Sequence, residues 1–120
     1  MAKNCHQMGD VLDWTNDTGS TVSSGQVVVI GALIGVALVD IANGATGSVA
    51  IDYVWELPKG SNAIGAGERV DYDISASVID QIGTPASGDL VGCGVAIAAA
   101  AGGDATVLVK INARGAAVTA

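Results

Sequence analysis

Apolar residues occur along this chain in short runs, rich in Val and Ile and often alternating with polar residues. Glycines interrupt every window long enough to hold an amphipathic helix, so a strand period fits better than a helical one. Eight strands are expected from this pattern. They are Val11–Thr15, Gln26–Ile30, Leu33–Val39, Thr46–Val54, Arg69–Ile74, Ser77–Ile79, Leu90–Ile97 and Thr106–Asn112.

The segments between these strands have the residues that turns require. Asn43-Gly44 and Gly102-Gly103-Asp104 are examples, since Gly and Asn accept the backbone angles of tight turns. About eight short strands at this spacing predict an all-β fold, either a single compact β-sandwich or a small β-barrel. We expect an extended N-terminal arm over residues 1–10, a β domain over residues 11–114 and a C-terminal tail over residues 115–120.

One part of the chain echoes another. Leu33–Leu38 followed by Ser48–Ile51 resembles Leu90–Val95 followed by Leu108–Ile111. Each half is interpreted as one hairpin, and the two hairpins are predicted to face one another as pseudo-equivalent halves of a sandwich. A single pair is too few to define a repeat architecture.

The longest apolar stretch, from Val27 to Val39, is broken by Gly31 and Gly35. It is shorter than the roughly 18 residues that a membrane-spanning helix needs, so a pair of strands is predicted and no membrane association is expected.

The composition favours a protein that completes its stability in an assembly. The chain has 17 Gly, no Phe, and only two Trp and two Tyr, whereas large aromatic side chains dominate most core and interface energies. Its net charge of −7 repels phosphates, and the five Lys and Arg are scattered, so direct nucleic-acid binding is not expected.

Groups that carry chemistry are few. His6 stands alone beside Cys5, and adjacent side chains seldom face each other as a nucleophile and its base. Asp71 and Asp73 are interpreted as solvated surface carboxylates rather than a cation site, because the ligand spacing of a calcium loop is absent. No catalytic, metal or cofactor residues are predicted. No secretory signal is visible, so Cys5 and Cys93 are expected to be reduced thiols in a cytoplasm.

Several motifs together resemble the cement, or head-decoration, family of tailed phages, formerly a domain-of-unknown-function family. The resemblance covers nearly the whole chain. The stretches that carry it are Met1–Asn4, Gln7–Asp10, Ser24–Val28, Gly35–Gly44, Thr46–Ala50, Val54–Lys59, Ala66–Val70 and Gly92–Ala96.

This resemblance implies a compact β domain that binds the outer surface of an HK97-type capsid, bridges capsomers and stabilises the expanded head. The expected partners are the major capsid protein and further copies of the chain, with a homotrimer favoured over a dimer because closed symmetry matches a lattice. The protein would belong to the virion, assembled in the host cytoplasm. The candidate capsid or protomer contacts are the arm residues Lys3, Asn4, Cys5, His6 and Gln7 and a loop containing Trp55, Glu56, Leu57, Pro58 and Lys59.

A glycan- or receptor-binding β module of a phage head or tail appendage is the alternative. Glycan sites usually present aromatic faces, and this chain has only Trp14, Tyr53, Trp55 and Tyr72 to offer. The alternative is therefore the weaker one.

Overall fold

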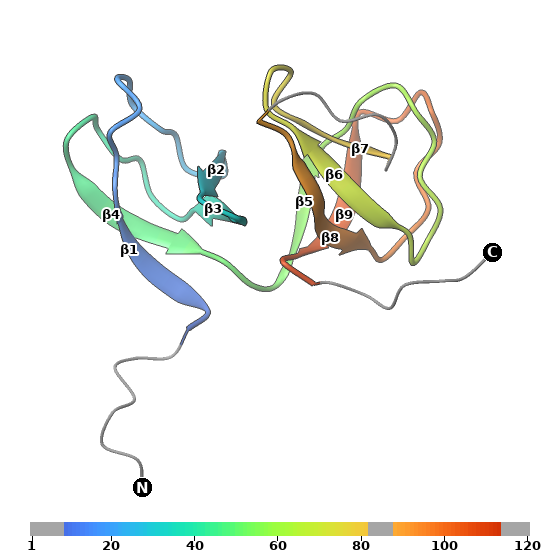
Figure 1. The fold of residues 1–120 in the computed structure, drawn as a ribbon, viewed down its shortest axis with the longest axis horizontal. Coiled ribbons are helices and arrows are strands. Elements are labelled where there is room, and N and C mark those ends of the chain that lie inside the picture. Colours follow the sequence, from blue (N-terminus) through green and yellow to red (C-terminus); the bar gives the residue numbers. More distant parts are fainter. Residues whose placement is uncertain (1–8, 82–87, 114–120) are drawn as a thin grey trace, which may run out of the picture.

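The computed structural model describes residues 9–81 and 88–113, which form nine strands in two antiparallel sheets (Figure 1). We call the two sheets with their loops the N-terminal unit and the C-terminal unit. The N-terminal unit contains β1 (Val11–Thr15), β2 (Val27–Ile30), β3 (Leu33–Ala37) and β4 (Thr46–Ala50). The C-terminal unit contains β5 (Val54–Pro58), β6 (Arg69–Asp73), β7 (Val78–Gln81), β8 (Leu90–Ala96) and β9 (Thr106–Ile111).

The all-β prediction is confirmed, and most strands begin and end within two residues of their expected positions. The described residues contain no helix, so none could cross a membrane as one. The long apolar run is the β2–β3 hairpin, closed by a two-residue turn with Gly31 at a positive φ of 59°. Glycine suits that position because it carries no Cβ.

One strand boundary was predicted wrongly. Thr46–Val54 was expected to be a single strand, but β4 ends at Ala50 and a separate strand, β5, starts at Val54. Tyr53 lies between them with a φ of 79°, which no strand residue adopts. The chain turns there, leaves the first sheet and enters the second.

The two units have the same topology. The strand order is β1-β4-β3-β2 in the first and β5-β9-β8-β6-β7 in the second, so β7 is the only addition among the described strands. The loops correspond as well: Val22 bridges Ile41 in one unit, and Ile64 bridges Ala100 in the other, each through two backbone hydrogen bonds. The predicted hairpin echo, β3–β4 and β8–β9, is therefore part of a larger repeat of four strands.

Register fixes which residues are equivalent. Val11 faces Ala50 as Val54 faces Lys110, so β1 corresponds to β5 and β4 to β9. The hydrogen bond from Leu38 N–H to Ser48 O recurs from Ile97 N–H to Leu108 O. Leu38 thus corresponds to Ile97. The sequence echo had aligned Leu38 with Val95, so the register differs from it by two residues.

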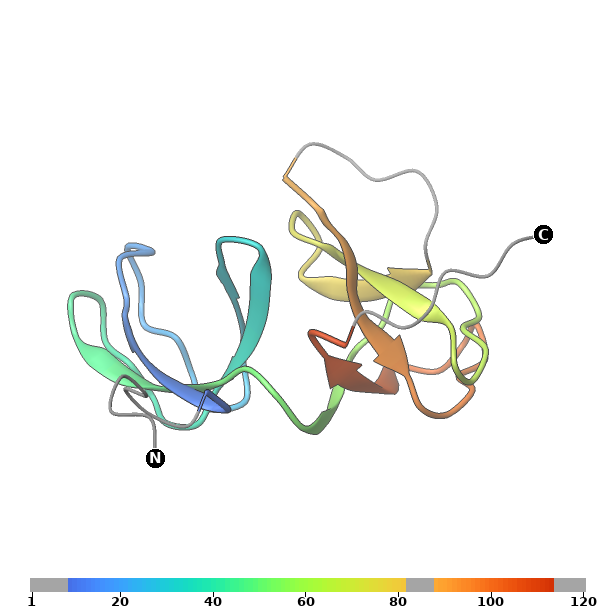
Figure 2. The same cartoon turned by 60° about the horizontal axis from the view of Figure 1, so that its bottom comes forward.

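The β2–β3 hairpin belongs to both cores, and Figures 1 and 2 show it on the side of the N-terminal unit that faces the C-terminal unit. Alternate residues of a strand point to opposite faces. One face contributes Ile34 and Val36 to the larger cluster of the C-terminal unit, and the other contributes Val28 and Ala37 to a smaller cluster of the N-terminal unit. This double burial explains why the run is apolar throughout.

A candidate docking surface and the junction between the units

The outward face of β5 and β9 carries exposed apolar side chains. Burial alternates strictly along β9, so Val107, Val109 and Ile111 point inward while Leu108 points out. Leu108 is 38% exposed, Val54 is 43% exposed and Ile97, whose N–H bonds Leu108 O, is 49% exposed. We call these three residues, with Glu56 and Pro58, the β5–β9 outer face.

The equivalents of Val54 and Ile97 in the N-terminal unit, Val11 and Leu38, are also apolar, but the position of Leu108 does not require an apolar residue. Ser48 is the equivalent of Leu108, and Asp13 is the equivalent of Glu56. A leucine where the sister position is a serine adds apolar surface that the monomer leaves in water. Exposed apolar residues that cluster mark docking sites more often than isolated ones do.

The sequence predicted Glu56 and Pro58 of this face as contacts, but not its apolar residues Val54, Ile97 and Leu108. The alternation in Thr106–Ile111 was the available signal, because Leu108 shares its parity with Thr106 and Lys110, both polar and exposed.

The predicted contact loop around Pro58 is a strand. β5 pairs with β9 over its whole length, from Val54 opposite Lys110 to Pro58 opposite Thr106. Proline is tolerated because it ends an edge strand. Glu56 and Pro58 are exposed and Trp55 is half-buried, with its Nε1–H donating to Asp52 O at 2.8 Å.

Leu57 and Lys59 are buried, so these two side chains are corrected from surface contacts to internal residues. Leu57 belongs to the larger apolar cluster. Lys59 Nζ donates to three carbonyl oxygens, those of Gly60, Asn62 and Gly102, at 2.6, 2.9 and 3.2 Å. The arm residues Lys3, Asn4, Cys5, His6 and Gln7 lie outside the described residues.

Lys59 has a counterpart in the repeat. The backbone hydrogen bond from Lys59 N–H to Ala105 O corresponds to the one from Asn16 N–H to Ala45 O. Asn16 is therefore the equivalent of Lys59 in the N-terminal unit. Asn16 is also buried, and its Nδ2 donates to Ser20 O and Ile41 O at 2.8 Å each. Each unit thus uses one buried polar side chain to satisfy loop carbonyls that would otherwise be unpaired.

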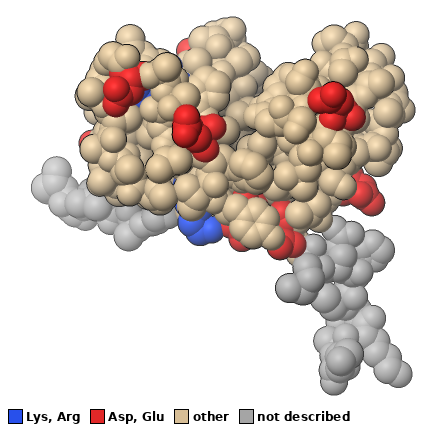
Figure 3. Space-filling model, turned by 180° about the vertical axis from the view of Figure 1, so that it is seen from behind, with Lys and Arg blue, Asp and Glu red and all other residues tan. Residues whose placement is uncertain are grey.

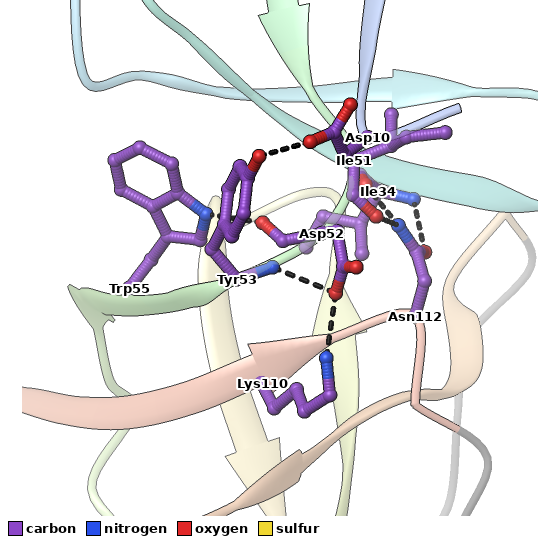
Figure 4. Close-up of polar contacts among 8 residues, drawn as sticks. All are labelled: Asp10, Ile34, Ile51, Asp52, Tyr53, Trp55, Lys110 and Asn112. Atoms are coloured by element: carbon purple, nitrogen blue, oxygen red, sulfur yellow. Dashed lines mark hydrogen bonds and ion pairs between the residues drawn. The ribbon is translucent and has the colours of Figure 1, made fainter. Parts of the chain in front are cut away.

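Polar side chains gather where the chain passes from one unit to the other (Figure 4). Lys110 Nζ lies 2.6 Å from Asp52 Oδ1, which also accepts Tyr53 N–H. The hydrogen bond from Lys110, and to a smaller extent that from Tyr53 N–H, holds the pKa of Asp52 below its usual value. The Tyr53 hydroxyl donates to Asp10 across the junction, and that bond raises the pKa of Tyr53. The Asp52–Lys110 and Tyr53–Asp10 contacts are exposed to solvent. They therefore contribute little to the free energy of unfolding and mainly fix how the chain passes between the units.

Asn112 joins the units more firmly. It belongs to the C-terminal unit, yet its side-chain oxygen accepts Ile34 N–H at 3.0 Å and its amide donates to Ile34 O and Ile51 O at 2.7 Å each (Figure 4). Ile34 lies where β3 and β4 no longer pair. The side chain of Asn112 therefore takes the place of a missing ladder residue in the neighbouring sheet.

The groups considered for chemistry do not converge. Asp71 is buried, not solvated as expected, and accepts Gly92 N–H at 2.8 Å. Asp73 accepts two N–H groups and one hydroxyl in its own turn, and the Ser75 hydroxyl is the main reason for its lowered pKa. Within residues 9–81 and 88–113, no three His, Cys, Asp or Glu side chains are grouped to hold a metal.

Cys93 is buried, and burial, with a smaller contribution from the Asp71 charge, raises the pKa of its thiol to about 12. Thiolate is the reactive form, so Cys93 is expected to resist alkylation in the native protein. In a Cys5→Ser variant, iodoacetamide labelling at pH 8 should be at least about a hundredfold slower in buffer than in denaturant. Equal rates would show that the thiol is open to solvent.

Comparison with known protein families gives a match over most of the chain. The family described as phage cement protein matches residues 6–111. Among curated proteins and solved structures, none matches significantly.

Proposed function

The chain belongs to the phage cement protein family, whose role in the capsid is structural, and we propose that it binds the outer surface of an HK97-type capsid and bridges neighbouring capsomers there. The observation that carries the proposal is the β5–β9 outer face, where Val54, Ile97 and Leu108 are exposed. A cement needs no chemistry. It adds interface area between subunits, and attachment at several linked points raises the effective affinity.

The proposed mode of binding places the apolar part of this face against the shell. Burying one leucine side chain contributes roughly 1.5 to 3 kcal/mol. We further propose that three copies associate around a local threefold position, with a dimer at a twofold position as the alternative, because closed symmetry matches such a lattice. Light scattering of the purified protein and its copy number on heads distinguish the two.

Leu108→Ser is the sharpest test, since serine is the residue that the sister position carries. The variant should fold normally and bind expanded heads that lack the protein roughly tenfold more weakly, as measured by occupancy at graded concentrations. Val91→Ser is the matched control: Val91 is exposed at the start of β8, outside the outer face. If Leu108→Ser and Val91→Ser occupy heads equally, the outer face is not the contact.

The N-terminal arm is the second proposed contact, through Lys3, Asn4, Cys5, His6 and Gln7. Deleting residues 2–8 should leave the fold intact and abolish binding to expanded heads. Circular dichroism checks the fold, and sedimentation with heads checks the binding. Unchanged occupancy would exclude the arm.

A further inference from the structure

The two units differ in how they protect one sheet edge. In the C-terminal unit, β7 covers the outer edge of β6, from Val70 opposite Gln81 to Asp73 opposite Val78. β2 is the equivalent of β6 and is also the last strand of its sheet. No strand among the described residues pairs with the outer edge of β2. The repeat therefore predicts where a strand would add.

The outer edge of β2 has backbone hydrogen-bonding groups that could pair with an added strand. Ile30 and Leu33 flank the two-residue turn and form a hydrogen-bonded pair. Hydrogen-bonded and non-hydrogen-bonded pairs alternate along an antiparallel ladder, so Val29 and Val27 direct their backbone N–H and C=O groups away from β3. Ile34 faces Val29, and its own N–H and C=O bond Asn112 instead. Within the described part of the chain, the backbone groups of Val27 and Val29 bond nothing.

The loop beside this edge points to the same conclusion. Gly60 N–H donates to Ile79 O of β7 at 2.9 Å, and Lys59 and Ile79 form a parallel bridge. Because Lys59 corresponds to Asn16, the next residue, Gly60, corresponds to Asp17. Asp17 N–H has no acceptor in residues 9–81 and 88–113. The donor that holds β7 in one unit is thus present and unused in the other.

A groove of about 440 Å³ lies along the free edge. We call it the β2 slot; its lining is Thr18, Ser20, Val22, Gln26, Val27, Val28 and Val29 on one side and Tyr72, Ile74 and Ser77 on the other. Figure 3 shows the molecule hollowed between the two units, with isolated acidic residues beside the hollow and a basic side chain at the lower edge of that face. None of the lining side chains is charged. The slot suits an uncharged, extended segment with small or β-branched side chains.

We propose that the β2 slot receives an extended segment of the shell protein, hydrogen-bonded antiparallel to β2 in the place that β7 occupies beside β6. Main-chain hydrogen bonds give such strand addition its affinity, and the slot selects the side chains. The inference rests on the proposed cement function. The shell is favoured over a described strand of a second copy because each such strand is part of a sheet and would bring that sheet with it, whereas the slot, lined on two sides, takes a single extended segment.

Ile74 provides a test that spares the fold. Its side chain lines the slot but is 44% exposed, so Ile74→Lys should fold and place an unpaired charge where the incoming strand would lie. We expect its affinity for expanded heads to fall at least tenfold. Val39→Lys is the matched control, since Val39 is 48% exposed and lies outside the slot, and it should bind within twofold of the wild type.

Hydrogen exchange gives a readout that does not depend on a substitution. The amide of Val29, which faces the slot, should exchange at least tenfold more slowly on heads than in free protein. The amide of Val28, directed to Gly35 of β3, should be slow in both. Residue-level exchange by fragmentation mass spectrometry measures the two side by side.

The outcomes separate the two proposals. If the wild type does not bind heads, the cement function itself fails. If the wild type binds, but Ile74→Lys binds equally well and Val29 exchange is unchanged, the slot inference fails alone. If the Val29 amide becomes protected in concentrated protein without heads, a second copy of the chain fills the slot. That result would overturn the proposal that the shell protein occupies it.

Discussion

Replacing Gly94 by alanine is expected to lower the free energy of unfolding by about 3 kcal/mol, the upper part of the range for overpacking a dense core. A Cβ at this position would lie 2.7 Å from the backbone oxygen of Lys110 and 2.7 Å from a methyl carbon of Val109. A backbone oxygen in a sheet cannot rotate away, so β8 and β9 would have to separate. For a domain of this size the melting temperature should fall by roughly 10 °C.

Two other glycines calibrate this prediction. Gly35 is the equivalent of Gly94 in the repeat, and a Cβ there would overlap Cγ1 of Val49, a fully buried β-branched side chain, and lie 3.2 Å from the backbone oxygen of Ala50. Because such a side chain has little room to turn away in a dense core, Gly35→Ala should cost about as much as Gly94→Ala. Gly103 has open space around it, and Gly103→Ala should change stability by less than about 1 kcal/mol. Thermal melts of the three variants rank them, and a Gly94→Ala melt that coincides with that of Gly103→Ala would contradict the packing argument.

Asn112→Ala is the second prediction with a large effect. It removes three hydrogen bonds and leaves Ile34 N–H, Ile34 O and Ile51 O without partners at the junction. It also puts alanine at a φ of 59°, which asparagine tolerates better. Since each unpaired buried group costs about 1 to 3 kcal/mol, a loss of about 3 kcal/mol is expected.

Two further substitutions separate these causes. Asn112→Gly relieves the backbone strain and still loses all three bonds, so it should recover only the smaller part of the stability. Asn112→Asp keeps an acceptor for Ile34 N–H but places a carboxylate against two carbonyl oxygens, and should be no more stable than Asn112→Ala.

The coupling of the two units can be read from tryptophan fluorescence. Trp14 lies in β1 and Trp55 in β5, so Trp55→Phe and Trp14→Phe variants each report on one unit. In denaturant the two transitions should coincide with Asn112 present and separate in the Asn112→Ala background. Coincident transitions in both backgrounds would show that Asn112 does not couple the units.

The candidate surface illustrates the limit of a local pattern. Around Pro58 the sequence indicated a loop, because proline commonly ends a strand. β5 is nonetheless a strand, since β9 supplies a partner along its whole length. Leu57 and Lys59 were expected at the surface and are buried, while Leu108 was not among the predicted contacts and is exposed. Whether a side chain is exposed depends on which strand lies beside it, and that strand is distant in the sequence.

The amino-acid sequence by itself determined the all-β class, most strand positions and the two equivalent hairpins, because alternation and turn residues act over a few neighbouring positions. It also carried the family motifs. Only the tertiary structure decided that the repeat has four strands, since β7 interrupts the second copy and hides the correspondence. The same holds for the buried role of Lys59, the bond of Asn112 to the other unit and the open edge of β2. These depend on pairing between distant segments, which leaves no period in the chain.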